Sequence, residues 1–289
     1  MRAVAQRYER GSLLGAGGTA EVWLARGADG LEVALKCAVR GHEREAALEL
    51  EARVLERIVH PNVVGLVGRA DDGGALALAL ERMRGATLHA VVERLAGPLS
   101  APLALEVVAQ AARGLAAAHA ALGDDGAPFE IVHRDVSPDN LFVTEAGAVK
   151  LFDFNVAQAR GVVSGTAGGE GGGAMLGKLA YMAPEQARGE PVDASADVFS
   201  LGAILWELVA GRRLFWRGNR LATLRALMDD PIPPIEPTLD ALLARALDRD
   251  RAARPSATTL AAALRALAPE SPARRAALGA LAREGADGA

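Results

Sequence analysis

Short runs of alternating or continuous apolar residues, separated by glycine and aspartate turns, fill roughly the first 80 positions of the 289-residue chain. Three of these runs, at 22–25, 32–36 and 75–80, predict β-strands. The short strands and the turns between them favour antiparallel pairing. The N-terminal part of the chain is therefore predicted to form a small antiparallel sheet.

One amphipathic helix is predicted between these strands. Its apolar residues repeat at helical spacing and form one stripe, made of Ala47, Leu48, Val54, Leu55 and Ile58. Glu51 lies inside this stripe, where a carboxylate without a partner costs free energy, so we expect a cation beside it. Alternatively, Glu51 lies at the rim and reaches water. His60-Pro61-Asn62 is expected to end the helix, because the residue before a proline disfavours helical backbone.

Helical spacing dominates from Ser100 onward. Apolar residues recur every three or four positions between 103 and 118, and Ser100 followed by Pro102 is typical of a helix start. A second long helix is predicted from Asp197 to Val209, and Gly211 suits its end. A strand-rich part followed by a helix-rich part indicates the α+β class.

Two segments lack such patterns. Between 161 and 177, eight of seventeen residues are glycine and none is aromatic, so we expect a mobile loop. After about Leu267 the chain continues with alanine, arginine, glutamate and glycine. This tail is either a frayed helix or a linker, and the sequence leaves both open.

Composition narrows the functional classes. A hydrophobic content of 51% is ample for a core, and a net charge of −4 gives no basic surplus, so nucleic acid is not an expected partner. The single cysteine, Cys37, cannot form an internal disulfide, and residues 1–8 lack the apolar run of a signal peptide. The apolar stretch 103–122 is interrupted by charged and polar residues, so we expect no membrane span. These features favour a soluble, cytoplasmic protein.

Two motifs carry the strongest chemical signal. Residues 133–140 read His-Arg-Asp-Val-Ser-Pro-Asp-Asn, and Asp-Phe-Asn follows at 153–155. Together they resemble the catalytic loop and the metal-binding loop of protein kinases. The resemblance implies that Asp135 orients a substrate hydroxyl and accepts its proton, and that Asn140 and Asp153 bind Mg²⁺. The alternative is a surface turn rich in aspartate and asparagine.

The resemblance extends to an ATP-binding surface of three segments. The first is a glycine-rich loop, formed by Leu14, Gly15, Ala16, Gly17, Gly18, Thr19, Ala20, Glu21 and Val22. The second is a strand carrying Ala34 and Lys36, in which Lys36 would hold phosphates and pair with Glu51. The third is the hinge from Glu81 to Met83. Taken alone, the glycine-rich loop is equally compatible with a plain hairpin turn.

The resemblance covers roughly residues 8–267 and implies two lobes, an N-lobe at 8–83 and a C-lobe at 84–267, followed by a tail or linker at 268–289. The activation segment would run from 153 to 185. It ends in Ala183-Pro184-Glu185, and Arg254 is the implied partner of Glu185.

One departure from the family pattern concerns a lysine. Ser137 stands where kinases of the Ser/Thr branch have lysine, and Lys178 stands where they have threonine. We predict that a lysine and a hydroxyl have exchanged sides. Lys178 would contact Asp135 and the transferred phosphate, with the Ser137 hydroxyl completing the link. The alternative is a lost lysine and a feeble or inactive kinase.

The implied function is that of a bacterial Ser/Thr protein kinase that uses ATP and Mg²⁺ to phosphorylate proteins, itself included. Self-association would permit phosphorylation between copies, with Ser164 or Thr166 as the acceptor. Two alternatives stay open. One is a nucleotide-binding pseudokinase that acts as a scaffold or switch, and the other is a small-molecule phosphotransferase.

Overall fold

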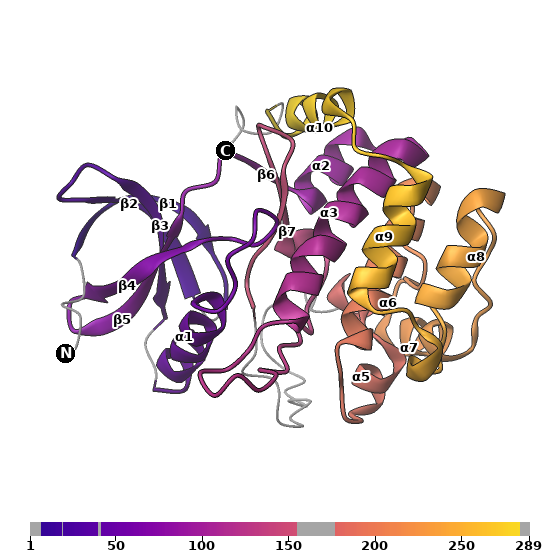
Figure 1. Ribbon diagram of the computed structural model, residues 1–289, viewed down its shortest axis with the longest axis horizontal. Coiled ribbons are helices and arrows are strands. Elements are labelled where there is room, and N and C mark those ends of the chain that lie inside the picture. The colour runs from indigo at the N-terminus through magenta and orange to yellow at the C-terminus, as the bar shows by residue number, and fades with distance from the viewer. Residues whose placement is uncertain (1–6, 19, 40–41, 155–176, 284–289) are drawn as a thin grey trace.

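The computed structural model describes residues 7–18, 20–39, 42–154 and 177–283. The chain folds into two lobes, an antiparallel-sheet lobe followed by a larger, mostly helical lobe (Figure 1). This is the α+β, two-lobed architecture that the sequence predicts. Residues 155–176 lie outside the described part, and so do Thr19, Ser164, Thr166 and most of the loop predicted at 161–177.

The N-terminal lobe is a five-stranded antiparallel sheet in the order β1-β2-β3-β5-β4, with one helix packed against it. Its elements are β1 (Tyr8–Ala16), β2 (Ala20–Gly27), β3 (Glu32–Ala38), α1 (His42–Leu55), β4 (Leu66–Asp72) and β5 (Ala75–Glu81). The three strands predicted from apolar runs coincide with β2, β3 and β5. The apolar stripe of α1 supplies the buried residues Leu48, Val54 and Leu55.

The end of α1 differs from the prediction, which is wrong in placing it at His60-Pro61-Asn62. The helix ends at Leu55, because the following backbone bonds span three residues instead of four, from Arg57 N to Val54 O at 3.1 Å and from Ile58 N to Leu55 O at 3.2 Å. Ile58 still packs in the core, at 4% exposure. The helix therefore ends in a tightened turn that precedes Pro61, so the proline does not determine where the helix ends.

The C-terminal lobe combines eight described helices with a three-stranded sheet in the order β6-β7-β8. The strands are β6 (Gly85–Thr87), β7 (Leu141–Thr144) and β8 (Val149–Leu151). The helices are α2 (Leu88–Leu95), α3 (Ala101–His119), α5 (Pro184–Arg188), α6 (Ser195–Ala210), α7 (Arg220–Asp229), α8 (Pro237–Ala246), α9 (Ala257–Leu267) and α10 (Pro272–Arg283). None of the described helices is long and apolar enough to cross a membrane.

Both predicted long helices are present and form the centre of this lobe. Ser100 is the N-cap residue of α3, and Gly211 ends α6 with a φ of 68° in the left-handed region, where glycine is favoured. All residues of α6 from Ala196 to Leu208 are buried, so this helix is enclosed by its neighbours. Helix α6 thereby gives the site a rigid support.

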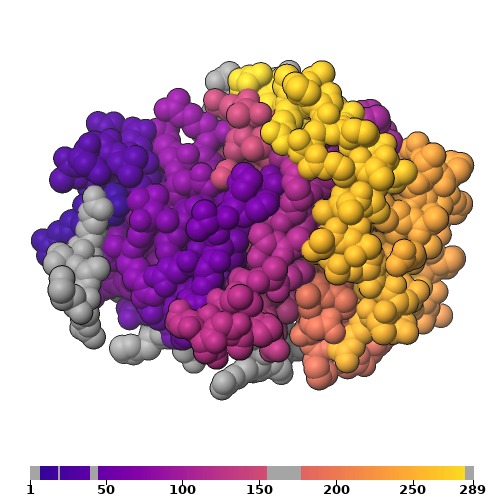
Figure 2. All heavy atoms as spheres, in the orientation of Figure 1, coloured from indigo at the N-terminus to yellow at the C-terminus, as the bar shows by residue number. Residues whose placement is uncertain are grey.

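The tail differs from the expectation of a frayed helix or a linker. Residues 272–283 form α10, which lies across β6, β7 and the helix α3 (Figures 1 and 2). Leu278 and Ala282, on α10 itself, are buried against the lobe. Helix α10 is thus packed onto the C-terminal lobe.

Candidate active site

A buried lysine joins three elements at the interface of the lobes. Lys36, on β3, is 9% exposed, and its Nζ donates to Glu51 Oε1 at 2.8 Å and Oε2 at 2.7 Å. The same ammonium donates to Asp153 Oδ1 at 2.6 Å. The cation expected beside Glu51 is therefore present, and it is Lys36. Glu51 is 5% exposed, which excludes the alternative of a carboxylate at a solvated rim.

Neighbouring charges favour the charged forms of Lys36 and Asp153, whereas burial raises the pKa of Glu51 above its usual value despite the opposing charge of Lys36. Burial alone would lower the pKa of Lys36, but the carboxylates of Glu51 and Asp153 raise it above its usual value. Burial acts in the opposite sense on Asp153, yet Lys36, followed by His133 and Lys178, holds the pKa of this carboxyl below its usual value. Lys36 and Asp153 are therefore both charged at neutral pH, as an electrostatic phosphate and metal site requires.

The backbone of the predicted catalytic loop is fixed by a buried aspartate. Asp197, 1% exposed on α6, accepts hydrogen bonds from His133 N at 2.9 Å and from Arg134 N at 2.8 Å. Arg134 has a φ of 66° in the left-handed region, so these two bonds hold an unfavourable backbone conformation directly before Asp135. Desolvation alone would raise the pKa of Asp197, but the hydrogen bond and charge of His119 hold it below its usual value. Sequence reasoning missed this role, although an aspartate inside an apolar helical run signals a buried acceptor.

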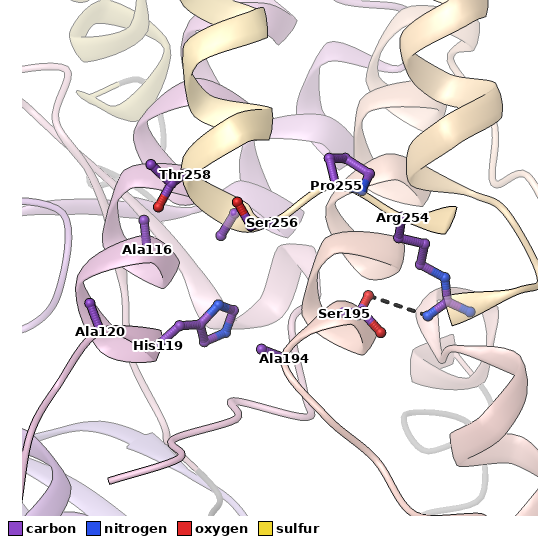
Figure 3. Close-up of a pocket in the computed structure, with 10 residues that line it drawn as sticks. Ala116, His119, Ala120, Ala194, Ser195, Arg254, Pro255, Ser256 and Thr258 are labelled. Atoms are coloured by element: carbon purple, nitrogen blue, oxygen red, sulfur yellow. Dashed lines mark hydrogen bonds between the residues drawn. The ribbon is translucent and has the colours of Figure 1, made fainter. Parts of the chain in front are cut away.

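His119 reaches Asp197 from the end of α3, with Nε2 and Oδ2 2.8 Å apart. His119, Ser195, Arg254 and Ser256 are among the residues that line a pocket of about 410 Å³. Figure 3 shows these side chains. This pocket contains no residue of the predicted site. Its contribution to the site is indirect, through the contact between His119 and Asp197.

His133 supports the loop from inside. It is fully buried, its Nε2 lies 3.1 Å from the Phe152 carbonyl oxygen, and its ring packs against Phe154 at 4.6 Å between centroids. These contacts connect the loop to the segment that carries Asp153. A structural position for His133 agrees with the family resemblance.

Asp135 lies at the centre of the loop, and one of its two carboxylate oxygens accepts hydrogen bonds from neighbouring side chains. Asn140 Nδ2 donates to Asp135 Oδ2 at 2.8 Å and to its carbonyl oxygen at 2.7 Å, and Lys178 Nζ donates to the same Oδ2 at 2.6 Å. No donor from the described residues reaches Oδ1. One oxygen is therefore anchored, and the other is open to a substrate hydroxyl.

Ser137 does not take the predicted part in this network. The residue is 1% exposed, and its Oγ makes no hydrogen bond to any described residue. Ser137 adopts extended backbone before the short turn Pro138–Asn140, and its carbonyl accepts from Asn140 N at 3.0 Å. The prediction that the Ser137 hydroxyl links Asp135 and Lys178 is therefore wrong, because the loop turns this hydroxyl inward.

The glycine-rich segment forms the β1–β2 turn, closed by a hydrogen bond from Gly17 N to Ala20 O at 2.9 Å. A Cβ added at Gly15 or Gly18 would meet no heavy atom within 4 Å, and neither glycine has a positive φ. Packing and backbone conformation thus leave the glycines unexplained. The missing side chains would permit close approach of a phosphate to backbone N–H groups, as the family resemblance predicts.

Strand register divides the predicted nucleotide contacts between two faces. Val22 is the pairing partner of Lys36, and Ala34 lies on the same face of β3, since side chains alternate along a strand. Glu21 pairs with Cys37 on the opposite face, and its Oε2 accepts from Trp23 Nε1 at 3.2 Å. The Glu21 side chain therefore points away from Lys36, and its predicted nucleotide contact would have to come from its backbone.

Cys37 is also directed away from the cluster. The thiol residue is 4% exposed, and burial, followed by the charge of Asp72, raises its pKa to about 11. A buried thiol with so high a pKa is chemically inert at neutral pH.

The hinge begins at Glu81, whose side chain is occupied. Its Oε1 accepts from Lys150 Nζ at 2.7 Å and from Gly65 N at 2.7 Å. Met83 packs against the core. The backbone N of Glu81 also donates to the Gly65 carbonyl at 2.9 Å, so neither Oε1 nor the amide of Glu81 is free to bind a nucleotide.

Asn140 and Asp153 suit Mg²⁺ by donor type, since Mg²⁺ prefers oxygen ligands. The described residues contain no group of three or more His, Cys, Asp or Glu side chains that could hold a metal. A Mg²⁺ ion here would therefore need oxygens from nucleotide phosphates and water, which is how kinases bind it.

A buried ion pair closes the activation segment. Arg254 donates to Glu185 through Nη1 at 2.7 Å and Nη2 at 2.9 Å, which confirms the predicted pairing. The guanidinium also donates to the Ser195 carbonyl at 3.3 Å, the dashed contact in Figure 3.

Comparison with known proteins agrees with this geometry. The family model described as "Protein kinase domain" matches residues 8–263. Tyrosine-protein kinase MasK of Myxococcus xanthus is 38% identical over 235 residues, which cover 76% of this chain and 35% of the relative. Serine/threonine-protein kinase PknB is 33% identical over 267 residues in both Mycolicibacterium smegmatis and Mycobacterium tuberculosis, covering 86% of this chain and 40% of each relative. The chain thus spans well under half the length of these relatives. On this match and on the geometry of its two loops, the chain belongs to the protein kinase domain family.

Proposed function

We propose that this chain is the catalytic domain of a bacterial protein kinase that transfers the γ-phosphate of MgATP to Ser or Thr hydroxyls of proteins, itself included. The observation that carries the proposal is the Asp135 carboxylate, with Oδ2 anchored by Asn140 and Lys178 and Oδ1 open. The extents proposed are 8–83 for the N-lobe, 84–267 for the C-lobe and 153–185 for the activation segment.

The geometry supports a direct transfer. Asp135 Oδ1 accepts the proton of the substrate hydroxyl while the hydroxyl oxygen bonds to the γ-phosphorus. The bond from this phosphorus to the bridging oxygen breaks, and ADP leaves. Lys36, positioned by Glu51, holds the other phosphates beneath the glycine-rich turn. Asn140 and Asp153 would hold Mg²⁺, which would neutralise phosphate charge during the transfer.

Tyrosine is the second acceptor to test, because one of the similar relatives is named a tyrosine-protein kinase. The other relatives cited above are named Ser/Thr kinases. We favour Ser and Thr on the larger number of relatives.

The test is incubation with radiolabelled MgATP, with intact mass and phosphoamino-acid analysis as readouts. We expect phosphoserine or phosphothreonine, mapped to Ser164 or Thr166, and no incorporation by Asp135→Asn. A rate that rises with protein concentration would indicate transfer between copies. Binding of a MgATP analogue without any transfer to itself or to a generic basic protein would contradict the proposal and favour a pseudokinase.

A further inference from the structure

Lys178 lies beside the reacting carboxylate in a fixed position. Its Nζ is 2.6 Å from Asp135 Oδ2, with the two side chains 33% and 22% exposed. It directly precedes a short helical turn, Leu179–Tyr181, whose residues are buried. Ser200, on α6, donates to the Tyr181 carbonyl at 2.8 Å and ties this turn to the centre of the lobe. Lys178 is thus a partly accessible cation on a supported segment.

The other two lysines of the chain are committed elsewhere. Lys36 donates to Glu51 and Asp153, and Lys150 donates to Glu81. Among the described residues, Lys178 is the only Lys or Arg side chain that forms an ion pair with Asp135. A phosphoryl group that approaches Asp135 would therefore come close to the ammonium already bound to this carboxylate.

An ammonium has three N–H donors, and one of them is used by Asp135. Two donors remain for phosphate oxygens. Charge on the transferred phosphoryl group is spread over three oxygens in the transition state, so a fixed cation at this position lowers the barrier.

We propose that Lys178 is a catalytic residue of the phosphoryl transfer, donating to an oxygen of the moving γ-phosphoryl group while it anchors Asp135. This inference rests on the proposed kinase function. Lys178 supplies charge and takes no proton, since the hydroxyl proton goes to Asp135. The cation comes from the activation segment instead of from the catalytic loop, where Ser137 occupies the corresponding position.

The test compares Lys178→Met and Lys178→Arg with the parent. Removing one donor to developing charge costs about 100-fold in rate, so we expect kcat of Lys178→Met to fall about 100-fold. Affinity for a MgATP analogue, measured by calorimetry, should stay within threefold, because the contact forms in transfer. Lys178→Arg keeps the charge and should recover part of the rate.

Arg188→Met is the matched control, since it removes a cation from the nearby helix α5 that, within the described part of the chain, forms an ion pair with the exposed Glu190 alone. Melting curves of all variants verify folding. A Lys178→Met kcat within twofold of an active parent would overturn this inference and leave the proposed function intact. An inactive parent would overturn both. A loss of nucleotide affinity with kcat unchanged would show Lys178 to be a binding residue only, and would also overturn the inference.

Discussion

Glu185 and Arg254 form the most deeply buried ion pair of the described residues, with side chains 4% and 0% exposed. Arg254 also donates to the Asp248 carbonyl at 2.6 Å and lies 4.9 Å from the Phe199 ring centroid. Every strong contact of the guanidinium is therefore made inside the protein. Removal of either partner leaves an uncompensated buried group.

We predict that Arg254→Met destabilises the protein by about 3–5 kcal/mol, because Glu185 would keep a buried charge without a partner. Urea unfolding measures this change. Arg188→Met, at an exposed pair, should change stability by less than about 1 kcal/mol. A loss below 1 kcal/mol for Arg254→Met would mean that Glu185 reaches water or another cation.

Buried charges were the most predictable part of the site. A carboxylate within an apolar stripe requires a cation, so the sequence alone predicted an ion pair for Glu51, and the structure shows Lys36 as its partner. The direction of the Ser137 hydroxyl and the face occupied by Glu21 were not predictable in the same way. Both depend on local backbone geometry, which the spacing of a motif does not specify.

Helix α10 packs through two glycines that lie far apart in the sequence. A Cβ on Gly279 would lie 2.3 Å from the Glu145 carbonyl oxygen, and one on Gly147 would lie 1.9 Å from the Arg275 carbonyl oxygen. Arg274 and Arg275 also lie near the buried carboxylate of Glu106, at 3.7 and 3.8 Å. The helix thus brings cations to a buried acid and closes over the β7–β8 turn.

We predict that Gly279→Leu destabilises the protein by about 2–3 kcal/mol, since the new side chain meets backbone and separates Leu278 from its site. Ala277→Leu, two positions away on the exposed side, is the matched control and should be near neutral. Thermal melting measures both variants. Equal melting temperatures would show that α10 contributes no stability to the lobe.

The tail was the element least open to prediction. Its alanine-rich sequence predicts helix as readily as linker. What holds this segment on the lobe is close backbone contact at Gly147 and Gly279, which lie on separate elements. The strands and the two long helices were predictable because burial of one face imposes a period on the sequence. The end of α1 was not predictable, because a tightened final turn leaves no periodic pattern in the sequence.

The two lobes are connected by more than the hinge. Val64 N donates to the Leu151 carbonyl at 2.8 Å, and Leu151 N donates to the Asn62 carbonyl at 2.9 Å. Glu81 adds a side-chain contact, since it leaves β5 of the first lobe and accepts from Lys150 on β8 of the second. The segment before β4 is thereby held to the strand that leads to Asp153.

We predict that Lys150→Met changes the KM for MgATP by up to about fivefold with little change in kcat, because a partly exposed ion pair contributes about 1 kcal/mol or less. Glu81→Gln should act similarly. If the pair acts as one unit, the double variant is no worse than either single one. Steady-state kinetics decide this, and additive effects would contradict a shared contact between the lobes.

The position of Cys37 has a practical consequence for labelling experiments on this protein. It is the only thiol of the chain, and it is buried with a pKa of about 11. Thiol reagents should therefore not react with the native protein. They should react with a variant that carries a cysteine at an exposed position such as Val59, which is 98% exposed. Fluorescent or spin labels can therefore be attached at introduced cysteines without first replacing Cys37.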